Sequence, residues 1–101
     1  MKHPASKAHA EQLRTLIRLA HGYRHVDVRP HGQHLIVELL HDGGREPVAR
    51  ATRLHGHGYD YGLSFRTHTG RWEPMPITGD IAEIARALSQ ELGAYLDPTN
   101  L

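Results

Sequence analysis

The residues with the clearest potential for chemistry are two histidines and an aspartate in a glycine-rich stretch. His55, His57 and Asp60 lie close together in the chain, and a glycine follows each histidine. Neutral imidazole nitrogens and a carboxylate oxygen are good ligands for zinc, and one turn could bring all three onto a single ion. A small metal-binding protein is therefore one hypothesis for function. The alternative is that these are solvated side chains of an ordinary loop.

Histidine is common elsewhere too, with ten in the chain. His25, His34 and His68 fall on the outward phase of predicted strands, so neighbouring strands could gather two or three of them. Such a cluster could bind a metal or respond to pH, because imidazole titrates near pH ~6.5. The competing interpretation is half-exposed strand histidines, and the strand order decides between the two.

Several other kinds of chemistry have no support in the sequence. The chain has no cysteine, which removes disulfides, thiolate zinc sites and thiol nucleophiles. It also shows no pair of carboxylates at a defined spacing, no serine, histidine and acid arrangement on a recognisable scaffold, and no phosphate-binding loop. We therefore expect a non-enzymatic protein.

The charge balance argues against a strongly basic nucleic-acid binder. The formal net charge is +1, whereas nucleic-acid-binding domains are commonly far more basic. Positive charge is concentrated before residue 25 and negative charge after residue 72. Opposite signs at the two ends favour packing the ends together, or docking one copy on another.

Length and composition indicate one globular domain. The chain has 101 residues, of which 39% are hydrophobic and 23% charged, as is ordinary for a folded domain. The first residues do not read as a secretion signal, and no window approaches the ~18 apolar residues of a membrane span. We expect a cytoplasmic protein with no membrane contact, a domain over residues 7–97, disordered residues 1–6 and a short tail at 98–101.

Two amphipathic stretches predict helices. Between Asp80 and Leu96, apolar residues recur at steps of three and four, which places them in one stripe along a helix. Asp80 and Glu83 have the spacing of a capping box at its start. A second helix is predicted over residues 7–20, with Ser6 as its N-cap. Both helices need an apolar surface to cover.

Alternating segments supply that surface. Strands are predicted over residues 24–29, 33–41, 47–55 and 59–69, and the glycines after Asp42 predict a tight hairpin. Residues 71–77 contain two prolines, which permit an edge strand at most. The predicted fold is α+β: a two-layer, four-stranded antiparallel meander with an N-terminal and a C-terminal helix on one face. Trp72 and Ile77 are expected to close the rim of the core.

The phase of the strands also predicts what the opposite face carries. In the third strand, Ala49 and Ala51 are expected to face the helices, because the other phase would bury Arg50 without a partner. The outward positions are then Arg29, His34, Ile36, Glu38, Leu40, Arg50, Thr52, Leu54, Arg66 and His68.

An exposed apolar patch on this face predicts a partner. Ile36, Leu40 and Leu54 would be exposed there beside Glu38, and a second copy could meet this surface face to face or edge to edge. The leading hypothesis is a small interaction module of bacterial regulatory or accessory type that forms a homodimer through these four residues. Another protein could occupy the same surface.

Single-stranded nucleic acid is the other candidate partner. Arg29, Arg50 and Arg66 could contact phosphates, while flat side chains could stack on bases. No aromatic residue is expected on this face, although surfaces of this kind use aromatic side chains. The sequence therefore favours self-association over nucleic-acid binding.

Overall fold

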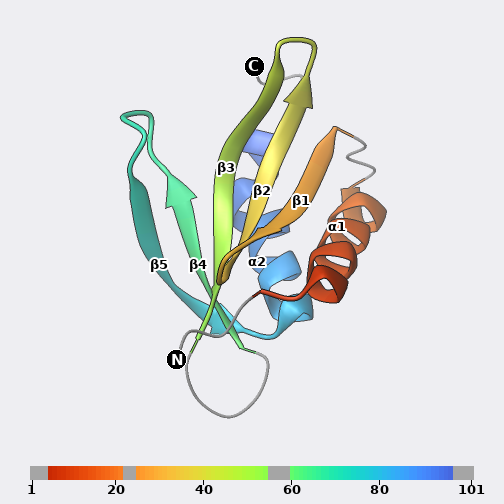
Figure 1. Ribbon diagram of the computed structural model, residues 1–101, viewed down its shortest axis with the longest axis vertical. Coiled ribbons are helices and arrows are strands. Elements are labelled where there is room, and N and C mark those ends of the chain that lie inside the picture. The colour runs from red at the N-terminus through yellow and green to blue at the C-terminus, as the bar shows by residue number, and fades with distance from the viewer. Residues whose placement is uncertain (1–4, 22–24, 55–59, 97–101) are drawn as a thin grey trace.

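The computed structural model describes residues 5–21, 25–54 and 60–96, with the side chains of residues 21 and 91–96 left aside. Two helices flank five strands along the chain (Figure 1). In order these elements are α1 (Lys7–His21), β1 (Val26–His31), β2 (His34–His41), β3 (Gly44–Arg53), β4 (Tyr61–Arg66), β5 (Trp72–Gly79) and α2 (Ile81–Leu96).

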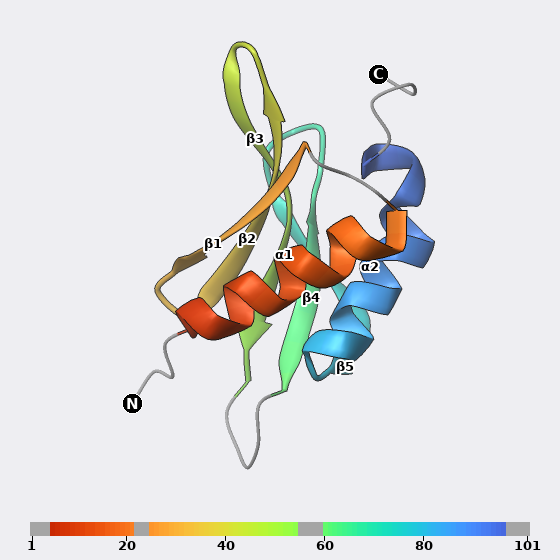
Figure 2. The same cartoon turned by 90° about the vertical axis from the view of Figure 1, so that its right-hand side faces the viewer.

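The strands form one antiparallel sheet in the order β1-β2-β3-β4-β5. Both helices lie on the same side of it, as Figure 2 shows from the edge. The predicted α+β meander is therefore confirmed, but the predicted strand count is wrong because β5 is a fifth strand. Its prolines, Pro74 and Pro76, are tolerated because β5 is an edge strand with a single neighbour, and because a register shift in the β4–β5 ladder surrounds Pro76.

The core lies between the sheet and the helices. Ala49 and Ala51 are fully buried there, so the phase predicted for the third strand is confirmed. The same face carries the inward residues of β1 and β2 and the large side chain of Tyr61. The core residues contributed by the strands are Val26, Val28, Leu35, Val37, Leu39, Ala49, Ala51, Tyr61 and Leu63.

The residues predicted to cap the N-termini of the two helices do so. The Ser6 hydroxyl accepts hydrogen bonds from the N–H groups of Ala8 and His9 at 3.1 and 3.3 Å. At α2, the Glu83 N–H donates to Asp80 Oδ1 at 2.9 Å, and the Asp80 N–H donates to Glu83 Oε1 at 3.4 Å, which completes a capping box. Within the described chain, no helix is both long and apolar enough to cross a membrane.

The chain is ordered slightly before α1. The Ala5 N–H donates to the carbonyl of Gly32 at 2.8 Å, and the Ala5 side chain packs against the core. Gly32 has a φ of 61° in the β1–β2 turn, a left-handed conformation that favours glycine. Ala5 thus takes part in the packing of the domain, and residues 1–4 and 97–101 lie outside the described chain.

Candidate functional site

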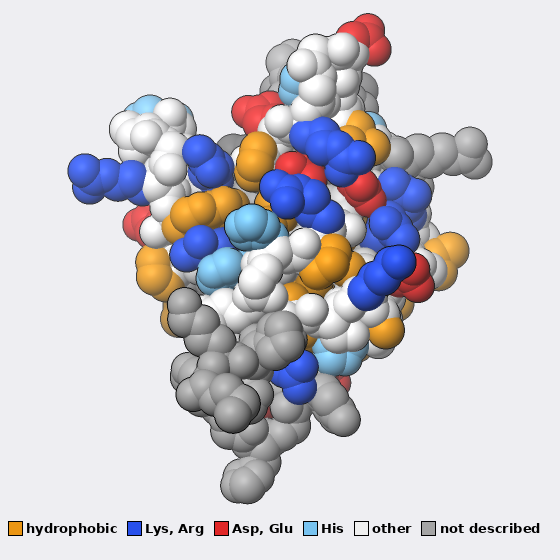
Figure 3. Space-filling model, in the orientation of Figure 1, with side chains coloured by type: hydrophobic (Ala, Val, Ile, Leu, Met, Phe, Trp, Pro, Cys, Tyr) orange, Lys and Arg blue, Asp and Glu red, His pale blue; other side chains and the backbone are white. Residues whose placement is uncertain are grey.

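The sheet face without helices is the surface on which the candidate site lies. It faces the viewer in Figure 1, and in the same orientation Figure 3 shows Lys and Arg side chains spread across it with hydrophobic side chains between them. Because side chains alternate along a strand, this face carries the residues between the core positions. We call it the open sheet face.

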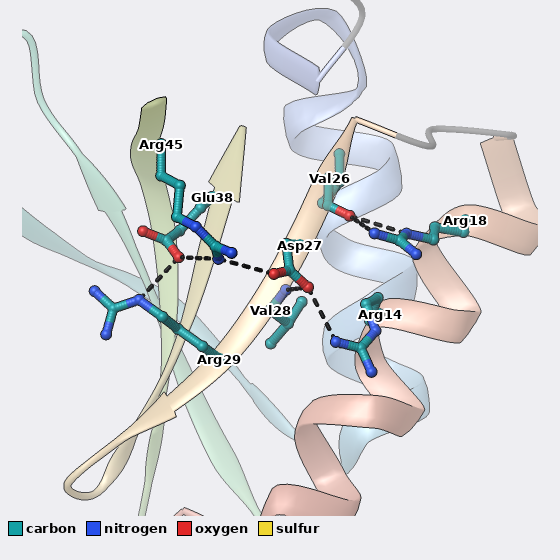
Figure 4. Close-up of polar contacts among 8 residues, drawn as sticks. All are labelled: Arg14, Arg18, Val26, Asp27, Val28, Arg29, Glu38 and Arg45. Carbon is teal, nitrogen blue, oxygen red and sulfur yellow. Dashed lines mark hydrogen bonds and ion pairs between the residues drawn. The ribbon is translucent and has the colours of Figure 1, made fainter. Parts of the chain in front are cut away.

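On the β1 and β2 half of the open sheet face, charges neutralise one another. Asp27 and Glu38 are directly opposite in the β1–β2 register, where two like charges would destabilise the pair. Arginines offset this repulsion (Figure 4). Arg29 donates to Glu38 at 2.8 Å, and Arg45 contacts Asp27 at 2.9 Å and Glu38 at 3.4 Å.

Helix α1 takes part in the same network. Arg14 donates to Asp27 Oδ1 at 3.0 Å, and Arg18 donates to the Val26 carbonyl from two of its nitrogens. Burial alone would raise the pKa of Asp27, but hydrogen bonds from Arg14, the Val28 N–H and Arg45 outweigh it and lower the pKa. This network therefore joins α1 to the sheet as well as neutralising half of the open face.

The β3 to β5 half of the open sheet face is different. The guanidinium carbon of Arg50 on β3 lies 4.7 Å from the centroid of the Trp72 ring on β5, and that of Arg66 on β4 lies 5.4 Å from it. Both distances are within the range of a cation–π interaction. Ser64 on β4 is buried and pairs with Arg50 on β3 and with Pro74 on β5. We call this group the Arg50–Trp72–Arg66 cluster.

The two arginines of the cluster have no acidic partner in the described part of the chain. Neither takes part in any of the ion pairs formed there, and the buried Nε of Arg50 has no hydrogen-bond partner. Burial lowers the pKa of Arg50, although the group stays charged at neutral pH. Two neighbouring cations without a counter-charge are suited to receive an anion, and the indole offers a surface for a flat group.

Trp72 is where the sequence-based expectation fails most clearly. It was expected at the rim of the core, and the open face was expected to lack aromatic residues. Trp72 pairs with Arg66 in the β4–β5 register, so both side chains share the open face. The alternation of side chains along β5 is the missed signal. Ile77 packs against the core as predicted, and alternation from Ile77 back to Trp72 places Trp72 on the opposite, open face.

The predicted interface residues offer little free apolar surface. Ile36 is 6% exposed and Glu38 is 2% exposed, while Leu40 is half-buried. Ile36 pairs with Arg29 on one side and Arg50 on the other, so long side chains flank it. Leu54, at 38%, is the exposed member of the set.

The predicted nucleic-acid-binding arginines divide into two kinds. Arg50 and Arg66 both lie over the ring of Trp72, whereas Arg29 is ion-paired with Glu38. The cluster therefore contains two of the three predicted cations and one aromatic residue that the sequence did not suggest.

The histidines are not gathered into a metal site within the residues that the structure describes. His34 hydrogen bonds to Thr52 at 2.8 Å, near the β1–β2 turn. The His25 carbonyl instead accepts from the Leu40 N–H, at the opposite end of β2, and His68 lies in the turn between β4 and β5. Of the predicted zinc ligands, His55 and His57 lie outside the described residues and Asp60 is exposed. The zinc site stays a prediction.

A groove adjoins the Arg50–Trp72–Arg66 cluster. It lies between the β2–β3 hairpin and the β4–β5 hairpin, which diverge beyond the paired part of β3 and β4 (Figure 1), and its volume is about 730 Å³. Arg66 belongs both to the cluster and to the groove. The residues lining it are Arg45, Glu46, Pro47, Val48, Phe65, Arg66, Thr67, His68, Gly70 and Glu73.

Comparison of the chain with protein-family models, with curated proteins and with solved structures found no match.

Proposed function

We propose that this protein binds single-stranded nucleic acid on the β3 to β5 half of its open sheet face. The observation that carries the proposal is the Arg50–Trp72–Arg66 cluster, in which two guanidinium groups share one indole ring and no carboxylate of the described chain contacts either. On the other half of the face Arg29 and Arg45 are ion-paired with Asp27 and Glu38, so the arginines of the cluster are the ones left to meet a ligand anion.

The chemistry of the cluster fits this ligand. Guanidinium groups donate paired hydrogen bonds to phosphate oxygens, and their flat faces stack on aromatic systems. When a guanidinium group turns from the indole to a phosphate, the ring face that it leaves can stack on any base, which gives binding with little sequence preference. A modest net charge of +1 is compatible with such a site because the relevant charge is local.

The alternative partner, a second copy on the same face, is less well supported. A face-to-face dimer would bury two guanidinium groups without acidic partners from each copy, and an uncompensated buried charge costs about 3–5 kcal/mol. The apolar residues that would offset this cost are largely covered already, as Ile36 is only 6% exposed. Edge pairing through β5 is opposed by Pro74 and Pro76, which lack N–H donors.

The test is the binding of a labelled oligothymidylate at low salt, measured by fluorescence anisotropy. Arg50→Ala and Arg66→Ala should each weaken binding about tenfold or more and reduce the slope of log affinity against log salt by about 1. Arg86→Ala is the matched control. It removes the same charge from an exposed position on α2 and should leave the affinity unchanged.

Two results would overturn the proposal. One is no binding by the unmutated protein at low salt, and the other is equal weakening by all three variants. Polyglutamate serves as a competitor that has negative charge without bases. If it displaces the oligonucleotide as well as unlabelled oligothymidylate does, the cluster is a general anion site and the nucleic-acid assignment is wrong.

A further inference from the structure

We infer that the groove between the β2–β3 and β4–β5 hairpins receives an unpaired base, so that the site selects single strands over duplexes. This inference rests on the proposed function and assigns a role to a surface outside the Arg50–Trp72–Arg66 cluster. Arg66 lines the groove and is also a member of the cluster. A phosphate held at Arg66 would therefore bring the next base to the mouth of the groove.

The size and floor of the groove suit a base. A volume of about 730 Å³ lies within the ~300–1,000 Å³ that is usual for small-molecule pockets. Pro47, Val48 and Phe65 supply apolar surface. Val48 and Phe65 also pack against the core, but Phe65 is only half-buried, so part of its side chain is left for contact with a base. Thr67 and His68 add polar groups that can hydrogen bond to the edge of a base.

The charges at the groove also separate base from phosphate. Two acids, Glu46 and Glu73, and two arginines, Arg45 and Arg66, line it. Arg45 is ion-paired with Asp27 and Glu38, so the exposed carboxylates of Glu46 and Glu73 oppose a phosphate that moves from Arg66 into the groove. Carboxylate oxygens can nevertheless accept hydrogen bonds from the N–H groups of a base. Phosphates are therefore favoured at Arg50 and Arg66, and the base is favoured between the hairpins.

Selection of single strands follows from this arrangement. In a duplex each base is paired and stacked, and extruding one costs a few kcal/mol. A duplex could still place its phosphates against the arginines, but it could not fill the groove without that cost. Single strands can turn their bases outward freely.

The experiment compares an oligothymidylate with an abasic strand of the same length and charge, both titrated with the unmutated protein at one salt concentration. We expect the abasic strand to bind at least about 5- to 150-fold more weakly, which is the effect of losing one stacked base at about 1–3 kcal/mol, because it can stack neither on Trp72 nor in the groove. A duplex of the same length should also bind more weakly than the oligothymidylate. Phe65→Leu, which keeps an apolar side chain but loses the ring, should weaken oligothymidylate binding several-fold and leave abasic binding unchanged.

The outcomes separate the two proposals. Equal affinity for the strands with and without bases would overturn both base stacking at Trp72 and the role of the groove, and would leave a general anion site. A weaker abasic strand together with unchanged oligothymidylate binding by Phe65→Leu would overturn the role of the groove alone. Equal weakening of both strands by Phe65→Leu would also overturn it, because the ring would then act only on the fold. Absence of binding by either strand would instead overturn the proposed function itself. If Phe65→Leu does not fold, His68→Ala makes the same comparison, because His68 lines the groove and is exposed; equal weakening of both strands by it, or no weakening of either, would likewise overturn the role of the groove.

Discussion

Arg29 Nε lies 2.8 Å from Oε1 of Glu38, a carboxylate whose side chain is 3% exposed. Arg45 approaches the same oxygen at 3.4 Å. Glu38 thus contacts two arginines of the open sheet face, and together with Asp27, which also pairs with Arg45, it balances their charge. This balance distinguishes that half of the face from the half that carries the Arg50–Trp72–Arg66 cluster.

The first prediction concerns Glu38→Gln, which keeps the shape of the side chain but removes its charge. The free energy of unfolding should fall by about 1–2 kcal/mol, because charge-assisted hydrogen bonds are lost while the arginines remain partly hydrated. Oligonucleotide affinity should rise, because Arg29 and Arg45 lose a competing anion. Denaturant unfolding and fluorescence anisotropy measure the two effects.

The matched control for Glu38→Gln is Glu11→Gln, which removes a negative charge from an exposed position on α1. It should change stability by less than about 0.5 kcal/mol and leave the affinity unchanged. An unaltered affinity in Glu38→Gln would show that the ligand does not reach the β1 and β2 half of the face.

The second prediction concerns Asp27 and acid. Its pKa is lowered in the folded protein, so the unfolded state takes up a proton first as the pH falls. The stability contributed by Asp27 is present above its unfolded pKa of ~3.9 and is lost as the pH falls through the folded value. Asp27→Asn should therefore be less stable than the unmutated protein at pH 7, and the difference should shrink in acid. A difference independent of pH would contradict this.

The third prediction concerns His9, whose Nδ1 lies 2.7 Å from the Tyr61 hydroxyl. Burial, followed by the charge of Arg53, lowers the pKa of His9. The stability that depends on neutral His9 is therefore fully present above pH ~6.5, the usual pKa of histidine. It declines as the pH falls through the lower pKa of His9 in the folded protein.

Replacement of His9 should reveal this dependence. In His9→Gln, the loss of stability between pH 7.5 and 5.5 should be smaller than in the unmutated protein, because glutamine does not titrate. Thermal unfolding at the two pH values measures it. His68→Gln is the control, since His68 is exposed and its replacement should leave the slope unchanged. Equal slopes in all three proteins would rule out a contribution from His9.

The fourth prediction tests self-association, which the sequence favours. Ile36→Glu is unsuitable because a charge at a position that is 6% exposed should destabilise the monomer itself by several kcal/mol, on the order of 3–5. Leu54→Glu, at 38% exposure, tests association without that effect. If the open face forms the predicted dimer, sedimentation should give twice 11.4 kDa for the unmutated protein and a monomer for Leu54→Glu. A monomeric unmutated protein would end this hypothesis.

Much of the fold is predictable because its signals are local. The Asp80 and Glu83 capping box depends on residues within one helical turn, and the burial of Ala49 and Ala51 follows from the cost of burying Arg50. The hairpin after Asp42 depends on glycines, and Gly44 adopts a φ of 133°. These features need no knowledge of distant parts of the chain.

The candidate site was harder to predict because it depends on neighbours that are distant in sequence. Pro74 and Pro76 permit an edge strand at most, and without a strand register the sequence predicts Trp72 at the rim of the core. Ile36 looked exposed because its phase is outward, but its burial follows from cross-strand pairing with Arg29 and Arg50. Such pairings become visible only when the register is known.

Trp72 is the only tryptophan in the chain, and the guanidinium carbons of Arg50 and Arg66 lie 4.7 and 5.4 Å from its ring centroid. Fluorescence excited selectively at tryptophan, beyond the absorption of the tyrosines, therefore originates from the proposed ligand site, so occupancy can be followed with an unlabelled strand. Because Arg50 and Arg66 attract anions, iodide should quench this emission more effectively than caesium at equal concentration, and a bound strand should remove the difference.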